Sequence, residues 1–156
     1  MIEVAVTLQF NQYCLGNCRY KTVSRFLHDA NDRVMFLPTW WAAVMRYAAQ
    51  LLNKHQAAVK HIDWDPVIIG NPREYRRFYA QGRFTKHEAF YPGDIIEVHA
   101  VLPGEITLID FRELLTIAGC YKGMSPYRPE DKYGTFEVLT VATRRRAVSA
   151  QITEEA

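Results

Sequence analysis

The chain has 156 residues, of which 49% are hydrophobic and 23% are charged, as is typical of one globular domain with one core. The formal net charge is only +2, so a nucleic-acid-binding surface would have to come from local clustering of basic side chains. The N-terminus shows no basic-then-apolar leader, and no apolar run approaches the length that spans a bilayer. We therefore expect a cytoplasmic protein without a membrane partner.

Three cysteines are present, Cys14, Cys18 and Cys120, and their odd number and low density argue against a disulfide framework. Cys14 and Cys18 have a C-x3-C spacing, but no second Cys or His pair completes a tetrahedral zinc site. We expect neither a metal nor another cofactor, and we interpret the cysteines as buried thiols in a reducing cytoplasm.

The N-terminal part predicts one strand, an irregular segment and one helix. Residues 2–10 are apolar and rich in β-formers, which is typical of a buried strand, and residues 11–35 suggest a loop or a short hairpin. Residues 36–58 give the clearest helical pattern, with a proline and a threonine suited to its first turn. Its expected apolar stripe consists of Trp40, Val44, Tyr47 and Leu51.

The remaining chain predicts four strands and a second helix. We expect strands at 59–70, broken at its proline, at 73–91 and at 94–102. A helix is predicted over 108–119, with its final glycine as the C-terminal stop, and a last strand over 133–146.

This element order predicts an α+β fold. Removing one hairpin or extension leaves βαββαβ, the ferredoxin-like unit, in which two helices cover one face of an antiparallel sheet. We expect a single domain over 1–146 and a polar C-terminal tail over 147–156.

The segment "GCYKGMSPYRPEDKYG" (119–134) combines glycines, prolines, basic residues and tyrosines. Glycines allow positive φ or a close backbone approach, while cations and rings suit the backbone and bases of a single strand. The spacing matches neither a P-loop nor a dinucleotide fingerprint, and an ordinary helix-to-strand connection is the alternative interpretation. The candidate binding residues in it are Gly119, Tyr121, Lys122, Gly123, Tyr127, Arg128, Lys132 and Gly134.

A second cluster lies in residues 73–91, where five basic residues alternate with aromatic rings and only two acids oppose them. Interleaved cations and rings are typical of grooves that bind single strands, whereas a solvated sheet face is the alternative. The candidate residues are Arg76, Arg77, Tyr79 and Arg83.

Three further features leave alternatives open. Arg144–Arg146 form a basic run that is either solvated charge or a phosphate contact. Trp40 and Trp41 are either both core residues, or one is exposed and marks a partner or base-stacking surface. None of the five histidines has a metal-binding spacing, and His28 is the best candidate for a general base in RNA cleavage.

The order of elements and the glycine-rich segment resemble the RAMP superfamily, the RRM-like proteins of CRISPR effector complexes. More closely, residues 108–138 resemble a family of small uncharacterised phage proteins, through Ala118-Gly119, Gly123, Arg128-Pro129 and Gly134-Thr135-Phe136. The chain departs from that phage pattern in having Thr135 in place of an arginine and Ser125-Pro126 in place of a glycine. The resemblance implies a RAMP-like fold and nucleic-acid binding.

Three functions follow as hypotheses. The first is a non-enzymatic, phage-encoded protein that binds single-stranded RNA or DNA and assembles with itself along the strand. The second is a protein-interaction module that docks on, or mimics a subunit of, a host CRISPR or other defence complex. The third is a metal-independent RAMP-type ribonuclease that uses His28.

Overall fold

The computed structural model describes residues 1–124 and 133–144. It is a mixed α+β structure, as expected, and its main sheet is antiparallel with the strand order β11-β1-β10-β7. These strands are β1 (Ile2–Phe10), β7 (Asp63–Trp64), β10 (Ile95–Leu102) and β11 (Phe136–Thr143). The long predicted strand over 59–70 is wrong, since a 3-10 turn, η1 (Ala58–His61), and Pro66 leave only β7 as regular strand.

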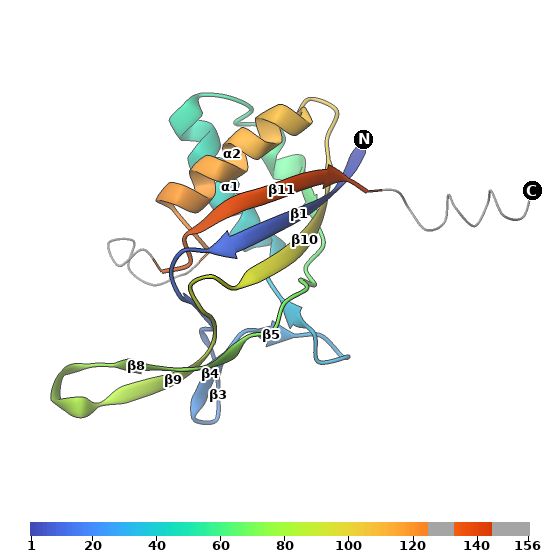
Figure 1. The fold of residues 1–156 in the computed structure, drawn as a ribbon. Helices are drawn as coiled ribbons and strands as arrows, with labels where there is room; N and C mark the ends of the chain where they lie inside the picture. The colour runs from blue at the N-terminus through green and yellow to red at the C-terminus, as the bar shows by residue number, and fades with distance from the viewer. Residues whose placement is uncertain (125–132, 145–156) are drawn as a thin grey trace, which may run out of the picture.

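Two helices, α1 (Pro38–Leu52) and α2 (Leu108–Tyr121), cover one face of the main sheet (Figure 1). Alternate residues of β1 and β10 point toward these helices and are buried, because successive side chains of a strand face opposite sides. The resulting core includes Val6, Leu8 and Phe10 from β1, all at most 1% exposed.

The apolar stripe of α1 differs from the predicted one. The helix begins with Pro38 at N1, as expected, but it ends at Asn53, whose left-handed conformation caps it well before residue 58. The predicted Leu51 is 56% exposed, whereas Trp41 is fully buried and stacks on Trp64 at 4.4 Å between ring centroids. Trp40 is partly buried against the core, so both tryptophans are packed rather than free. The buried stripe consists of Trp41, Val44, Met45, Ala48 and Ala49.

A second sheet projects away from this body (Figure 1). Strand β9 (Phe84–Phe90) pairs with β8 (Arg73–Phe78) on one edge, and with β2 (Cys14–Leu15) and β4 (Val23–Arg25) on the other. Strand β3 (Cys18–Tyr20) completes it beside β4. We call these five strands the small sheet.

The predicted single strand over 73–91 is wrong, because the chain reverses between β8 and β9 to form a hairpin. The reversal passes through η2 (Ala80–Gly82), where Gln81 and Gly82 both have positive φ, 65° and 73°. The irregular segment 11–35 contains short strands, including β5 (Leu27–His28) paired with β6 (Val34–Met35).

The second helix also ends later than predicted. Thr107 caps its N-terminus by accepting a hydrogen bond from the Asp110 N–H, and the helix continues through Gly119 to Tyr121. Gly119 therefore does not stop the helix; its Cα lies against Phe136, where a Cβ would be only 2.5 Å from the Phe136 carbonyl oxygen. The residue that leaves the helix with positive φ is Gly123, at 76°.

Of the three cysteines, only Cys14 is buried, while Cys18 is partly exposed and Cys120 is exposed, so the expectation of three buried thiols is wrong. No helix of the described residues is long and apolar enough to cross a membrane. The predicted tail over 147–156 lies outside the described residues.

Candidate nucleic-acid interface

The basic residues of the chain concentrate on the small sheet. Residues 14–25 and 73–90 hold eight lysines and arginines and two glutamates, while the rest of the chain holds eleven basic and fifteen acidic residues. A chain with a net charge of +2 thus places a local positive surface on one projecting element, which is the electrostatic footprint of a nucleic-acid-binding protein.

Strand alternation divides the β8–β9 hairpin into two faces, because directly opposed residues share a face. Arg76 lies opposite Lys86, and Phe78 lies opposite Phe84; we call these four residues the phenylalanine face. The other side, the tyrosine face, consists of Tyr75, Arg77, Tyr79, Thr85 and His87. The predicted residues Arg76 and Arg77 therefore point to opposite sides of the hairpin.

The phenylalanine face is open to solvent. The Phe78 and Phe84 rings lie 5.5 Å apart between centroids, and they are 65% and 42% exposed. The Arg76 guanidinium carbon lies 4.9 Å from the centroid of the Phe84 ring. Among the described residues, Arg76 forms no ion pair with a carboxylate, and neither does Arg83, whose carbonyl oxygen accepts from the Tyr79 N–H where the hairpin turns. This face thus offers uncovered rings beside two cations: Arg76, which has no carboxylate partner among the described residues, and Lys86, which lies 4.0 Å from Glu74.

The same face continues onto β4 and β3. Val23 lies opposite Lys86 in the parallel β4–β9 pair, and Tyr20 lies opposite Val23. The Tyr20 ring is 55% exposed, and the side chains of Lys21 and Arg25 lie 5.4 and 5.6 Å from its centroid. These residues were missed by sequence reasoning, because only the parallel pairing of β4 with β9 brings residues 20–25 beside residues 84–88.

The tyrosine face differs because its polar groups hydrogen-bond to one another, while the Tyr79 ring remains 44% exposed. Arg77 donates from Nε to Nε2 of His87 at 3.2 Å and from a terminal nitrogen to the Tyr79 hydroxyl at 3.2 Å. The buried His87 donates from Nδ1 to the Gly16 carbonyl oxygen at 2.7 Å. Burial lowers the pKa of His87, and the positive charge of Arg77 adds to this effect. A neutral His87 with an accepting Nε2 therefore holds the Arg77 guanidinium within the protein.

A tyrosine cluster joins the hairpin to the ends of the glycine-rich segment. Tyr75 stacks on Tyr13 at 4.1 Å, and the pKa of Tyr75 is raised, first by burial and then by the nearby phenols of Tyr133 and Tyr13. The Gly134 N–H donates to the Tyr13 carbonyl oxygen at 2.7 Å. The two clusters that stood apart in the sequence are thus neighbours in the structure.

The described ends of the glycine-rich segment are fixed to each other. Gly123 and Gly134 both have positive φ, as their residue type predicted, and the Met124 N–H donates to the Gly134 carbonyl oxygen at 2.9 Å. Tyr121 is 61% exposed, and the Lys122 ammonium lies 6.0 Å from the Tyr47 ring centroid. The predicted residues Tyr127, Arg128 and Lys132 lie outside the described residues, as do Arg145 and Arg146.

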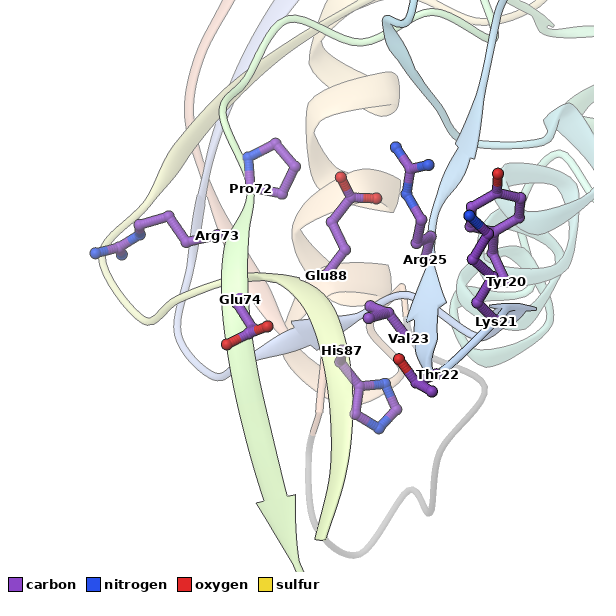
Figure 2. Close-up of a pocket in the computed structure, with 10 residues that line it drawn as sticks. All are labelled: Tyr20, Lys21, Thr22, Val23, Arg25, Pro72, Arg73, Glu74, His87 and Glu88. Carbon is purple, nitrogen blue, oxygen red and sulfur yellow. The ribbon is translucent and has the colours of Figure 1, made fainter.

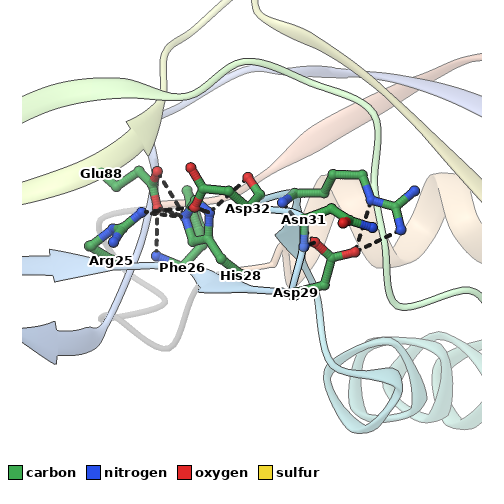
Figure 3. A network of polar contacts seen from close by, with 8 residues as sticks. Arg25, Phe26, His28, Asp29, Asn31, Asp32 and Glu88 are labelled. Carbon is green, nitrogen blue, oxygen red and sulfur yellow. Dashed lines mark hydrogen bonds and ion pairs between the residues drawn. The ribbon is translucent and has the colours of Figure 1, made fainter.

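His28 lies in a polar network between β5 and β9 (Figure 3). Its Nε2 is 2.8 Å from Oε1 of Glu88, and its Nδ1 is 3.0 Å from Oδ1 of Asp32. Arg25 also approaches Nε2 at 3.2 Å, but the two Glu88 oxygens at 2.8 and 3.0 Å make Nε2 a donor to Glu88. Burial acts to lower the pKa of His28, yet the hydrogen bonds to Glu88 and Asp32 and the Glu88 charge outweigh it and raise the pKa. Both ring nitrogens therefore face carboxylate oxygens that favour the protonated ring, and a protonated ring has no lone pair for a general base.

The outer face of the main sheet differs from the small sheet in chemistry. Along β1 this face presents Glu3, Thr7 and Gln9, and along β10 it presents Glu97 in an ion pair with His99. The aromatic residues of β1, β10 and β11 within the described chain, Phe10 and Phe136, are both buried on the helix side. Along the described strands of this acidic face, the His99 imidazole is the ring nearest to solvent, but it is only 17% exposed and is paired with Glu97, so the small sheet is the better candidate interface.

Within residues 1–124 and 133–144, no group of three or more His, Cys, Asp or Glu side chains is placed to hold a metal ion.

Comparison with known proteins reveals similarity at the level of structure. No protein-family model matches the sequence, and no curated protein matches it. A chain of the type III-B Cmr-beta complex bound to cognate target RNA has a similar structure, with a TM-score of 0.63 and 12% identity over 92% of this chain. This chain spans 61% of the length of that one. A chain of a type IV-B CRISPR complex gives a TM-score of 0.57 at 8% identity, covering 94% of this chain and 92% of the other.

These likenesses confirm, for the fold alone, the predicted resemblance to subunits of CRISPR complexes. The resemblance to a phage protein family stays a prediction.

Proposed function

We propose that the protein binds single-stranded nucleic acid, with RNA as the preferred polymer, through the phenylalanine face of the small sheet and without cleaving the strand. The observation that carries this proposal is the pair of exposed rings, Phe78 and Phe84, beside Arg76 and Lys86 on an element that concentrates the basic residues of the chain. Rings of this kind stack on unpaired bases, and cations beside them pair with phosphates.

The fold supports RNA as the ligand class. We infer that β1-α1-β7-β10-α2-β11, with the strand order β11-β1-β10-β7, is the ferredoxin-like βαββαβ unit of RAMP-type proteins, and that the small sheet is an insertion into it. Both similar structures come from CRISPR complexes, one of them bound to target RNA. Fold similarity alone does not establish function, so the exposed rings and cations carry the argument.

The first test combines purification and salt titration. The protein is purified without nuclease, its 260/280 nm absorbance ratio is measured, and any retained polymer is digested with RNase or DNase. The nucleic-acid-free protein is then titrated with labelled 20-nucleotide RNA, DNA and duplex at several salt concentrations. We expect single strands to bind, RNA most tightly, with log Kd rising linearly with log salt concentration. A protein that binds none of the three at low salt would contradict the proposal.

A second candidate is a module that docks on, or mimics a subunit of, a CRISPR complex. It is favoured by the similarity to the type IV-B chain, which covers nearly the full length of both chains. Assembly of several copies along a strand would be consistent with either candidate. Co-purification with a CRISPR complex that survives nuclease treatment would favour docking. Loss of the association on RNase treatment would instead mean that the protein and the complex were held together by a shared RNA strand.

RNA cleavage by His28 is not part of the proposal. Its ring nitrogens lie 2.8 Å from Glu88 and 3.0 Å from Asp32, and these carboxylates favour the protonated ring, which cannot accept a proton. Incubation of labelled RNA with the protein in EDTA is the direct check, and cleavage that is lost in His28→Ala would restore the ribonuclease hypothesis.

A further inference from the structure

A cavity of about 410 Å³ lies between the β3–β4 turn and the β8–β9 hairpin (Figure 2). The residues that line it include Tyr20, Lys21, Arg25, Glu74 and Glu88. Tyr20, Arg25, Glu74 and Glu88 share the side of the small sheet that bears the phenylalanine face, as the strand registers require. The cavity is thus continuous with the proposed strand-binding surface.

The two carboxylates of the cavity differ in what they already bind. Glu88 is committed, because it accepts hydrogen bonds from the Phe26 N–H at 2.9 Å and from His28 at 2.8 Å. Glu74 is 54% exposed, and among the described residues its carboxylate has one ion-pair contact, with Lys86 at 4.0 Å. Glu74 is therefore the acceptor available to a ligand in this cavity.

Glu74 places a negative charge on the basic surface that we propose binds a strand, and this charge has two opposite effects on binding. A carboxylate repels phosphates, so Glu74 weakens general binding to the strand backbone. The same carboxylate accepts hydrogen bonds from the exocyclic amino group of a base, as Glu and Asp do with the amino group of cytosine. Uracil has the shape of cytosine but presents a carbonyl oxygen at that position, which a carboxylate repels.

We propose that this cavity receives one unpaired base of the bound strand and selects bases that carry an exocyclic amino group, cytosine over uracil. The amino group of this base donates to Glu74, the exposed ring of Tyr20 on the far strand β3 stacks on a neighbouring base of the same nucleic-acid strand, and Lys21 and Arg25 pair with the flanking phosphates. Stacking on aromatic rings combined with hydrogen bonds to base edges is the usual way in which unpaired bases are recognised. This inference rests on the proposed function and adds a base preference to it.

The test measures the ratio of two affinities. Labelled 12-nucleotide oligo(C) and oligo(U) RNA are titrated with the wild-type protein, Glu74→Ala and the matched control Glu137→Ala, whose exposed carboxylate lies on β11 of the main sheet. We expect the wild type and the control to bind oligo(C) about fivefold more tightly than oligo(U), the size of one favourable base contact. In Glu74→Ala the ratio falls to about one, while binding of oligo(U) becomes tighter because a repulsive charge is removed.

A second pair of variants tests the stacking contact. Tyr20→Phe keeps the ring and should retain the preference, whereas Tyr20→Ala should weaken binding of oligo(C) about fivefold or more. Salt-sensitive binding of both oligomers with equal affinity would overturn the base preference and leave the proposed function intact. An unchanged ratio in Glu74→Ala would overturn the role of Glu74, and failure of both oligomers to bind wild-type protein would contradict the proposed function and this inference together.

Discussion

Replacing Gly123 with alanine tests whether the backbones at Gly123 and Gly134 are packed rigidly against each other. A Cβ at Gly123 would lie 2.7 Å from both the Gly134 carbonyl carbon and the Thr135 nitrogen, and backbone atoms cannot rotate away. Overpacking of this kind costs about 1–3 kcal/mol. The φ of +76° adds about 1–2 kcal/mol for an L-residue in the left-handed region. We therefore expect Gly123→Ala to lower the free energy of unfolding by about 3 kcal/mol.

Two other glycines separate the contributions. Gly82 has a φ of +73° but no atom within 4 Å of its Cβ position. Gly82→Ala should therefore lower the free energy of unfolding only by the cost of the left-handed conformation, about 1 kcal/mol. Gly104 has neither feature and should be nearly neutral on substitution. Urea denaturation followed by circular dichroism measures all three. If Gly123→Ala were no more destabilising than Gly82→Ala, the contact between Gly123 and Gly134 would not be rigid, and the reasoning would be refuted.

Three further predictions concern charge and reactivity. Arg76→Ala combined with Arg83→Ala should reduce the slope of log Kd against log salt concentration by about 1.4, because each lost phosphate contact reduces it by roughly 0.7. Lys54 is already paired with Glu113, so the control variant Lys54→Ala should leave the slope unchanged. The pKa of His28 is raised in the folded state, so the contribution of His28 to stability is complete below the ordinary pKa of 6.5. This contribution is lost as the pH rises through the pKa of the folded state. Urea denaturation from pH 6 to 8 should show the loss in the wild type and not in His28→Gln. Iodoacetamide should label Cys120 but not the buried Cys14 in the native protein, since burial raises the pKa of the Cys14 thiol; equal labelling of the two would contradict the packing.

Local sequence patterns predicted the parts of the fold that strong periodicity governs. Residues 2–10 and 94–102 alternate in a way that only a half-buried strand satisfies, and both strands were found within a residue of the expected bounds. The β8–β9 reversal was missed because Gln81-Gly82 lacks the Asn-Gly or Asp-Gly signal of a tight hairpin. The residue type of Gly119 predicts a helix stop, whereas in the structure its small size allows close packing on Phe136.

The candidate site depended on information that the sequence does not contain. The basic and aromatic cluster at 73–91 was visible as composition, but its division into an open and an internally bonded face required the hairpin register. Arg77 and Tyr79 hydrogen-bond to each other on the tyrosine face, while Arg76 remains beside Phe84 in solvent. Tyr20 joins the site because β4 pairs in parallel with β9 and brings Val23 beside Lys86. No local sequence pattern signals a contact between segments so far apart in the chain.

The central claim is tested most directly by removing the two exposed rings. The dissociation constant for a labelled 20-nucleotide RNA is measured for the wild type, for Phe78→Ala combined with Phe84→Ala, and for Ile109→Ala, an exposed apolar residue of α2 that serves as the matched control. Loss of base stacking should weaken RNA binding by the double variant about tenfold or more, with the control within twofold of the wild type. Wild-type affinity in a folded double variant would contradict the account.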